Sequence, residues 1–479
     1  MVENSNSNKQ ELFDLIVIGT GTAASVAASD CSSAGWKVAI IDSLPFGGTC
    51  ALRGCEPKKV FVEAAKVIDS NERHKDKGIV GSEKLHIKWS ELIRFKRTFT
   101  EPYPKHREKV YEKAGIIPFH GRAKFIGSTT LAVKSKMNDT KSGDIILNAK
   151  HILIATGAKP MKLNVLGEEY VITSDQFLEY SGEHLPDKIV FVGGGYVSFE
   201  FAHVAARAGA KVTILHRGKR PLEHFDPDLV NQLMQRSRDM GIDFYLHSEV
   251  EKINRSSDDL FSVQFSNTSA NSNTQPRSNV LEANMVVHGA GRQANVDELE
   301  LAAAGIEYTG RGIRVNEYLQ SVSNHSVYAA GDAAASDGFP LTPTATYEGS
   351  LAATNLINGN TIRTNYKGLP SVVFTIPSLA SVGMQEKEAQ ARGLKFRTRY
   401  KNTSSWISTR RVGETHSGFK VLIEDQTNRI LGAHILGPHA EEVINIFSMA
   451  IRLGLTSNEL NDPLLYAYPT SSSDVVYML

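Results

Sequence analysis

The stretch LFDLIVIGTGTAA at residues 12–24 decides the fold. Its first seven residues form an apolar run rich in β-branched side chains, which predicts a strand at 12–18. The turn Gly19-Thr-Gly21-Thr-Ala-Ala24 then leads into a small-residue stretch of helical character that closes at Gly35. A second strand is predicted at Lys37–Ile41. This order predicts a unit in which a pyrophosphate reaches backbone amides at the positive end of a helix.

The same unit recurs in the middle of the chain. It is predicted as a strand at Lys188–Val192, a turn at Gly193-Gly194-Gly195, a helix at Tyr196–Ala208 and a strand at Lys211–Leu215. Gly193 follows Gly19 by 174 residues, and Lys211 follows Lys37 by the same interval. Because chance would not preserve this register, the sequence predicts an α/β protein with two nucleotide-binding units.

The residue that ends the second strand differs between the two units. Asp42 stands there in the first unit, where a carboxylate can bind a ribose hydroxyl. The second unit has His216 instead, followed by Arg217 and further basic residues, which suits a 2′-phosphate. A solvated basic turn is the alternative interpretation, because Glu223 follows closely and such clusters are common on surfaces.

The composition is that of an ordinary globular protein. The 479 residues are 41% hydrophobic and 22% charged, and no run approaches the ~18 apolar residues of a membrane span. A net charge of +1 offers no general field for nucleic acid or anionic lipid. The three cysteines are too few for the disulfide framework of a secreted protein, and residues 1–11 lack the order of a signal peptide. We therefore expect a cytoplasmic enzyme with a small-molecule substrate and neither a nucleic-acid nor a membrane partner.

The last quarter of the chain predicts a separate α/β domain. Strands are expected at residues 372–375, 419–423 and 430–436, and apolar side chains recur at helical spacing over Ala440–Leu453. A stretch of about 110 residues with these elements is long enough to form a core of its own.

Two cysteines five residues apart mark the most reactive segment, which runs from Gly47 to Lys59 as GGTCALRGCEPKK. A regular helix would separate Cys50 and Cys55 by a rise of ~7.5 Å, beyond the ~4.4–6.8 Å between Cα atoms in a disulfide, so a distorted turn is required. The glycines supply that freedom, and a helix N-terminus with nearby basic residues would favour a thiolate. Zinc binding is the rival interpretation, but two thiols without further ligands make a poor site, and no metal site is expected.

With these residues in view, the chain resembles the flavin-dependent pyridine-nucleotide disulfide oxidoreductases, the family of glutathione reductase, dihydrolipoamide dehydrogenase and mercuric reductase. The resemblance covers nearly the whole chain. The other matching motifs are Ala155-Thr156-Gly157, Gly291-Arg292, Ala329-Ala330-Gly331-Asp332, Leu341-Thr342-Pro343, Phe374-Thr375-Ile376-Pro377 and Ile430-Leu431-Gly432-Ala433-His434.

The resemblance implies two Rossmann-like dinucleotide-binding domains and a C-terminal α/β dimerisation domain. Residues 1–160 and 290–365 would form the FAD-binding domain, 161–289 the NAD(P)H-binding domain and 366–479 the interface of a homodimer. The implied cofactors are FAD and NADPH, with NADH as the alternative. The residues expected at the cofactors are Gly19, Gly21, Asp42, Gly48, Thr49, Lys58, Ala123, Thr156, Gly157, Asp332, Thr342, Ala345, Gly193, Gly195, Tyr196, Arg217, Gly291 and Arg292.

The resemblance also assigns catalytic roles. Cys55 would lie against the flavin, and Cys50 would exchange with the substrate. Glu200 matches a carboxylate that pairs with a lysine near the flavin, here Lys58 or Lys59, and Tyr196 would cover the nicotinamide pocket. An ordinary helix carboxylate and a packed aromatic ring are the alternative interpretations of Glu200 and Tyr196.

The chain departs from the family at its tail. Disulfide reductases of this family typically carry a histidine and, five residues later, a glutamate, which the partner subunit delivers to the cysteines. Here Tyr468 replaces the histidine and Ser473 the glutamate, with Asp474 one place late. A tyrosine with a pKa near ~10 donates hydrogen bonds but is a poor base at neutral pH. Whether Asp474 or Tyr466 substitutes for the missing pair is left open.

Three functions are compatible with these features. The first is an NADPH-dependent reductase of a small disulfide that uses Cys50, Cys55 and Tyr468 with Lys59 and Glu200. The second is a flavin reductase of quinones, metal ions or dyes. The third is a dihydrolipoamide dehydrogenase-like subunit of a larger assembly.

Overall fold

The computed structural model describes residues 12–135, 144–267 and 278–479, so the polar N-terminal segment 1–11 lies outside the described residues. The chain forms two compact units. Unit 1 comprises residues 1–57, 97–160 and 292–366, and unit 2 comprises residues 58–96, 161–291 and 367–479. No helix in the described part of the chain is both long and apolar enough to cross a bilayer.

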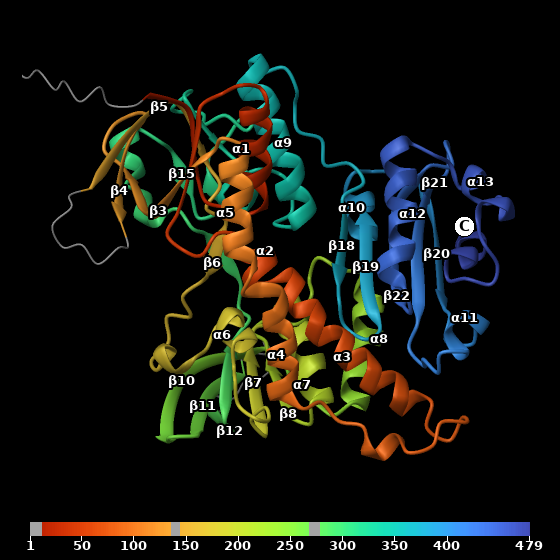
Figure 1. The fold of residues 1–479 in the computed structure, drawn as a ribbon. Helices are drawn as coiled ribbons and strands as arrows, with labels where there is room; N and C mark the ends of the chain where they lie inside the picture. Colours follow the sequence, from red (N-terminus) through yellow and green to blue (C-terminus); the bar gives the residue numbers. More distant parts are fainter. Residues whose placement is uncertain (1–11, 136–143, 268–277) are drawn as a thin grey trace, which may run out of the picture. The chain divides into compact units, whose positions relative to one another are not determined.

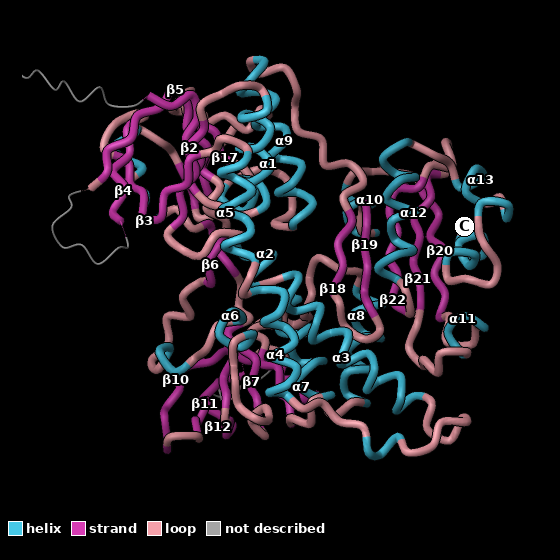
Figure 2. The backbone as a smooth tube through the Cα atoms, in the orientation of Figure 1, coloured by secondary structure: helices cyan, strands magenta, loops and turns pink. Residues whose placement is uncertain are grey.

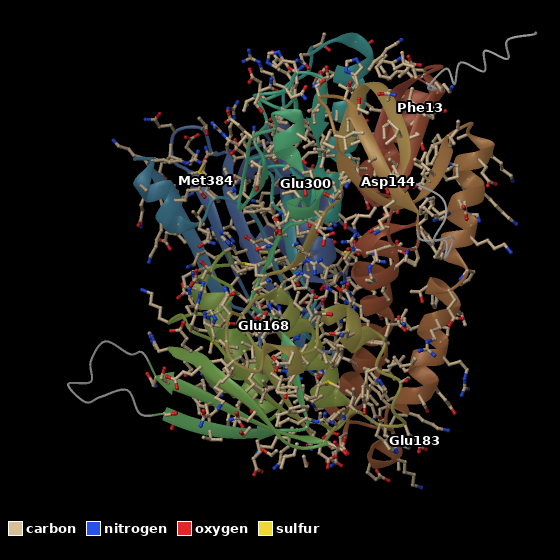
Figure 3. All side chains as sticks on the ribbon, turned by 90° about the vertical axis from the view of Figure 1, so that its left-hand side faces the viewer. Phe13, Asp144, Glu168, Glu183, Glu300 and Met384 are labelled. Atoms are coloured by element: carbon tan, nitrogen blue, oxygen red, sulfur yellow. The ribbon has the colours of Figure 1, made fainter. Side chains whose placement is uncertain are left out.

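A six-stranded sheet forms the centre of unit 1. It contains β1 (Leu12–Ile18), β2 (Val38–Asp42), β3 (Ile117–Phe125), β4 (Thr130–Ser135), β5 (Ile145–Ile154) and β17 (Val327–Ala329). Strand β1 runs parallel to β2 on one side and to β5 on the other, and β17 runs parallel to β5. Strands buried in a parallel arrangement read as continuous apolar runs, which explains residues 12–18. Phe13, labelled in Figure 3, belongs to this core.

Two helices cover one face of this sheet. Helix α1 (Thr22–Ser33) and helix α9 (Thr342–Asn358) bury alanines in one cluster with Leu15 and Val17 of β1, and they lie side by side in Figures 1 and 2. Small side chains let the helix backbones approach closely. Helix α5 (Tyr103–Lys113) contributes the buried Tyr111 to the same cluster.

The second nucleotide-binding unit predicted from the sequence lies in unit 2. Strands β13 (Met285–His288), β7 (Lys188–Val192), β8 (Lys211–Leu215) and β9 (Ile242–Tyr245) form a parallel sheet in that order. Helix α7 (Tyr196–Arg207) follows β7, and helix α8 (Pro227–Asp239) lies between β8 and β9 in the chain. A separate antiparallel sheet contains β10 (Ser248–Ser257), β11 (Leu260–Asn267) and β12 (Ser278–Ala283).

Unit 2 also contains the C-terminal sheet. Its antiparallel order is β18 (Pro370–Val373), β19 (Ser378–Gly383), β22 (Ile430–Gly437), β21 (Gly418–Glu424) and β20 (Phe396–Asn402), and helix α12 (Ala440–Leu453) packs on it. Helices α3 (Cys55–Arg73) and α4 (Trp89–Thr100) share a core with α7 and this sheet. The predicted mixed α/β architecture is confirmed.

Candidate active site

Both glycine turns end in a helix N-terminus that no side chain caps. Helix α1 begins after Gly21 and helix α7 after Gly195, and neither has an acidic residue in its first turn. Gly19 and Gly193 both have φ +111°, and a Cβ atom on either would lie 2.3 Å from a backbone carbonyl oxygen. The amides at both helix N-termini are therefore open to phosphate, which fits a dinucleotide at each turn.

Asp42 lies at the end of β2, beside the first glycine turn. Its Oδ2 accepts hydrogen bonds from Thr20 N at 3.0 Å and Thr20 Oγ1 at 2.6 Å, while Oδ1 accepts one from Leu44 N at 2.9 Å. These bonds orient the carboxylate that we expect to bind a ribose. The sequence analysis did not predict that Thr20 orients Asp42. Its position between Gly19 and Gly21 was the sign that could have indicated this role.

Most of the other residues expected at the flavin lie in unit 1, and Lys58 lies in unit 2. The Thr156 hydroxyl is buried and has no hydrogen-bond partner among the described residues. A buried polar group of this kind is expected where a ligand binds. Burial raises the pKa of Asp332, and the charge of Arg292 opposes that rise. Arg292 also donates a hydrogen bond to Ala158 O at 2.6 Å. The remaining expected residues are the buried Ala123 on β3, Gly157 after β5, and Ala345 on α9.

The second turn carries the basic cluster after β8. His216 is half-buried, its Nε2 lies 3.0 Å from Arg220 O, and burial lowers its pKa. Arg220 donates to the carbonyls of Phe225 and Glu223, so it holds the loop. Arg217 is exposed, as an arginine available to a phosphate would be. Gly291, with φ +115°, closes the segment after β13.

The two cysteines lie on either side of a break between helices. Helix α2 (Gly48–Arg53) carries Thr49 and Cys50, Gly54 breaks the helix at φ −150° and ψ −107°, and helix α3 begins at Cys55. The distorted turn that the spacing requires is therefore present. A Cβ atom on Gly48 would lie 2.4 Å from Gly21 Cα, so this segment packs directly against the first glycine turn.

Thr342 contacts both sulfur atoms. Its hydroxyl donates to Cys50 Sγ at 3.2 Å and lies 3.4 Å from Cys55 Sγ. The hydrogen bond with Cys55 and burial raise the pKa of Cys50, and Thr342 opposes that rise. The neighbouring thiol and burial therefore oppose, at Cys50, the thiolate that the helix N-terminus and nearby basic residues are expected to favour. The third thiol, Cys31, is fully buried, and burial raises its pKa to about 12.

Lys58 is the lysine that pairs with Glu200. Both side chains are buried in unit 2, and Lys58 Nζ donates to Glu200 Oε2. Glu200 Oε1 accepts a hydrogen bond from Phe374 N at 2.8 Å. Lys59 instead places its ammonium 3.2 Å from the centre of the Phe374 ring, and Tyr196 lies 5.6 Å from the Lys58 ammonium. The structure thus brings Lys58, Glu200 and Tyr196 together and leaves Lys59 outside the pair.

The C-terminal tail presents Tyr468 to solvent, with 79% of the residue exposed. Ser473 Oγ donates to Thr470 O at 2.7 Å, so it stabilises the tail's own turn. Asp474 accepts a hydrogen bond from Ser408, and burial raises its pKa. Tyr466 donates to Leu460 O at 2.9 Å. Both candidate substitutes for the missing His/Glu pair therefore have partners inside the C-terminal sheet and its connections.

A group of charged side chains that the sequence analysis missed lies in unit 2. Asp69, Arg73, Arg207, Arg236 and Glu414 form a buried network. Their spacing in the sequence gives no sign of it. Over residues 12–135, 144–267 and 278–479 no cluster of three or more His, Cys, Asp and Glu residues could hold a metal ion.

Comparisons with known proteins cover nearly the whole chain. Residues 13–349 match the family described as pyridine nucleotide-disulphide oxidoreductase, and residues 369–479 match its dimerisation domain. The chain is 32% identical to glutathione reductase of Burkholderia cepacia over 473 residues, which is 97% of this chain and 98% of that protein. It is 28% identical to mercuric reductase of Bacillus cereus over 458 residues, covering 94% of this chain and 69% of that protein.

A solved structure has the same architecture. It is described as a Cu(II) complex of the HOCl-induced flavoprotein disulfide reductase RclA from Escherichia coli. The TM-score is 0.84 at 25% identity, and the alignment covers 98% of this chain and 99% of that chain.

Proposed function

Because this chain belongs to the pyridine nucleotide-disulphide oxidoreductase family, we propose that it passes electrons from NADPH to a small disulfide through Cys50 and Cys55. The observation that carries the proposal is the arrangement of the two thiols. They flank the helix break at Gly54 and share Thr342 as a hydrogen-bonding partner. A pair held in this way can close to a disulfide and reopen without unfolding the segment.

Enzymes of this family are flavoproteins that use FAD and NAD(P)H and have a dimerisation domain. The uncapped turn at Gly19 and Gly21, Asp42 and the unpartnered Thr156 would hold FAD, and the turn at Gly193 and Gly195 would hold the nicotinamide nucleotide. When bound, FAD would supply the electron pair, taken from NADPH, for reduction of the Cys50–Cys55 disulfide.

The chain's own residues perform the exchange with substrate. Cys50, as a thiolate, attacks one sulfur of the substrate disulfide, and the first substrate thiol leaves after taking a proton. Cys55, as a thiolate, then attacks Cys50 Sγ, which releases the second thiol and forms the Cys50–Cys55 bond. One dithiol is oxidised as one disulfide is reduced. Thr342 donates to the Cys50 sulfur during this exchange.

Acid–base help at the cysteines differs from the His/Glu arrangement. We propose that Tyr468 from the partner subunit's tail donates a hydrogen bond to a sulfur or to the acceptor, in a homodimer formed through the C-terminal domain. We place the protein in the cytoplasm, because three cysteines are too few for the disulfide framework of a secreted protein.

NADPH preference should depend on Arg217. An exposed arginine after β8, with His216 where an acid would repel phosphate, favours the 2′-phosphate. A charged hydrogen bond is worth ~1.5–3 kcal/mol, on the order of ten- to a hundredfold in kcat/KM, and Glu223 points to the lower half of that range. We expect Arg217→Ala to reduce kcat/KM for NADPH and to leave kcat/KM for NADH unchanged. Steady-state kinetics with both nucleotides checks this, and equal use of both by the wild type, unchanged in the variant, would contradict it.

Two other functions stay open, each with its own support. Reduction of metal ions or quinones is favoured by Tyr468 in place of histidine and by the similarity to mercuric reductase. A role as subunit of a larger lipoyl-carrying assembly is favoured by 29% identity over 469 residues to dihydrolipoyl dehydrogenase of Chlamydia muridarum.

An acceptor screen separates the three functions. Purified enzyme, yellow with FAD, is reduced with about two electron equivalents, and a long-wavelength charge-transfer band is expected from Cys55. NADPH oxidation is then measured against disulfides, quinones and metal ions with wild type and Cys50→Ser. Loss of disulfide turnover in Cys50→Ser supports the proposal. Full activity of Cys50→Ser with the preferred acceptor would favour the second function, and copurification with a carrier protein would favour the third.

A further inference from the structure

Two ion pairs of opposite direction join helices α3 and α7. At the beginning of α3, Lys58 is the cation and Glu200 of α7 the anion. Three turns later on α3, Asp69 is the anion and Arg207 of α7 the cation. Both ends of the contact are therefore fixed by charge, and the second pair lies outside the groups assigned to the reaction.

Asp69 is the centre of the second pair. It is 5% exposed and receives Arg207 Nε at 3.1 Å, Arg236 Nη2 at 2.7 Å and Arg73 Nε at 2.6 Å. A Glu414 carboxylate oxygen lies 3.4 Å from Arg236 Nε and offsets part of the positive charge of the three arginines. These cations lower the pKa of Asp69 against the effect of burial, so the carboxylate stays ionised at neutral pH.

Helix α7 is itself fixed against the C-terminal sheet. Phe374 N donates to Glu200 at 2.8 Å, Ile376 N lies 3.2 Å from His203 Nδ1, and Arg207 Nη2 donates to Ile376 O at 3.2 Å. Glu200, His203 and Arg207 are spaced to share one face of α7. The backbone therefore holds Oε1 of Glu200. The position of α3 then determines how the Lys58 ammonium pairs with Oε2.

We propose that Asp69 is a positioning residue for the flavin chemistry. By binding Arg207 it fixes α3 along the axis of α7, and so fixes the Lys58 ammonium against Glu200. This inference rests on the proposed function and on the expectation, stated in the sequence analysis, that the Lys58–Glu200 pair lies near the flavin. Asp69 itself is 14 residues after Cys55, about 21 Å along the helix, so it does not touch the reacting atoms.

The expected effect is electrostatic. A positive charge held beside a flavin favours its electron-rich reduced form, and the strength of this effect depends on the distance of the charge. Without the carboxylate of Asp69, α3 loses the contact with Arg207 that restrains it along α7, and Lys58 is less well placed. The flavin midpoint potential should then fall, in the same direction as when the Lys58 charge is removed.

Four variants of the holoenzyme test this. Asp69→Asn removes the carboxylate charge, Asp69→Glu retains it on a longer stem, and Lys58→Met calibrates the effect of the ammonium. Asp226→Asn is the matched control, because Asp226 is 1% exposed and pairs with Lys420 at 2.8 Å in the same unit but is not part of the α3–α7 contact. The readouts are the flavin midpoint potential and the charge-transfer absorbance at two electron equivalents, together with the melting temperature.

We expect a lower potential and a weaker charge-transfer band in Asp69→Asn, a smaller change in Asp69→Glu, and no further shift when Asp69→Asn is added to Lys58→Met. Asp226→Asn should lower the melting temperature and leave the potential unchanged. The inference is overturned if Asp69→Glu and the folded fraction of Asp69→Asn both have the wild-type flavin potential. It is also overturned if the potential shifts of Asp69→Asn and Lys58→Met add in the double variant. An unchanged potential in Lys58→Met would overturn it too, whereas the proposed function is decided separately by the wild type's turnover of disulfides.

Discussion

At the scale of a single residue, Thr342 contacts both thiols. Its hydroxyl lowers the pKa of Cys50 against the larger effects of the Cys55 hydrogen bond and of burial. Hydrogen bonds to charged groups are worth ~1.5–3 kcal/mol, so we expect Thr342→Val to raise the pKa of Cys50 further. The pH dependence of alkylation of the reduced enzyme by iodoacetamide measures this.

Thr342→Ser is the control for that measurement, since it keeps the hydroxyl and should keep the alkylation profile close to that of the wild type. If Thr342→Val alkylates with the wild-type profile, the hydrogen bond at 3.2 Å has no influence on the thiolate.

In the proposed function, we expect Tyr468 to limit proton transfer at the cysteines. General acid–base catalysis contributes ~10²–10⁴ in rate, so glutathione disulfide or lipoamide should be reduced far more slowly than a one-electron dye. We expect Tyr468→Phe to lower turnover modestly, because the proposed role of the phenol is to donate a hydrogen bond and not to remove a proton. Steady-state rates of disulfide reduction by the wild type and the variant check this, and a loss of ~10²-fold or more in Tyr468→Phe would contradict it.

A designed relay gives a second test of the tail. Tyr468→His alone should restore little, because Ser473 is bonded to Thr470 O and cannot orient an imidazole. Adding Ser473→Glu should restore more disulfide turnover. Equal rates for the single and double variants would show that the tail does not act in this way.

At the scale of elements, the contact between helix α2 and the first glycine turn should control flavin retention. Gly48 has φ +69°, and its added Cβ would lie 2.4 Å from Gly21 Cα. Gly48→Ala should therefore separate α2 from the turn and lower the FAD content of purified protein, measured by absorbance per chain. Gly35→Ala is the control, because Gly35 has φ +86° but nothing within 4 Å of its added Cβ. Both variants carry ~1–2 kcal/mol of backbone strain, so equal FAD loss would assign the effect to strain rather than to the contact.

Local sequence patterns predicted which helices and strands form better than they predicted the residues at which these begin and end. The apolar runs and glycine turns predicted both nucleotide-binding units, and helix α7 ends at Arg207, one residue before the prediction. The strand expected at 372–375 is displaced to Pro370–Val373, because Phe374 N donates to Glu200 instead of to a neighbouring strand. The network around Asp69 could not be predicted, since it joins charges from four distant segments and tertiary packing alone brings them together.

At the scale of the whole molecule, buried histidines should make stability fall in acid. Burial lowers the pKa of His203 well below its usual value and also lowers that of His434, so the unfolded chain binds more protons than the folded one as the pH falls below ~6.5. The stabilisation is complete above that pH and is lost on acidification toward the folded-state values. Each such histidine costs up to about 1.4 kcal/mol per pH unit in this window.

We therefore expect the melting temperature to decrease between pH ~7 and ~5. His203→Gln should reduce this dependence, since a glutamine does not take up a proton. The exposed His325→Gln is the control and should leave the slope unchanged. If the melting temperature decreases with pH by the same amount in all three proteins, His203 does not couple folding to proton binding.

The late position of β17 in the chain has a consequence for biosynthesis. This strand completes the first sheet beside β5, yet roughly 170 residues separate Ile154 from Val327, and a ribosome needs on the order of 10–30 s to add them. The β13–β7–β8–β9 sheet emerges during that interval, while β5 has an open edge that can pair with other nascent chains. The yield of soluble enzyme in a foreign host should therefore depend on translation speed across residues 155–326 and on chaperones that shield this edge, more than on the stability of the finished protein.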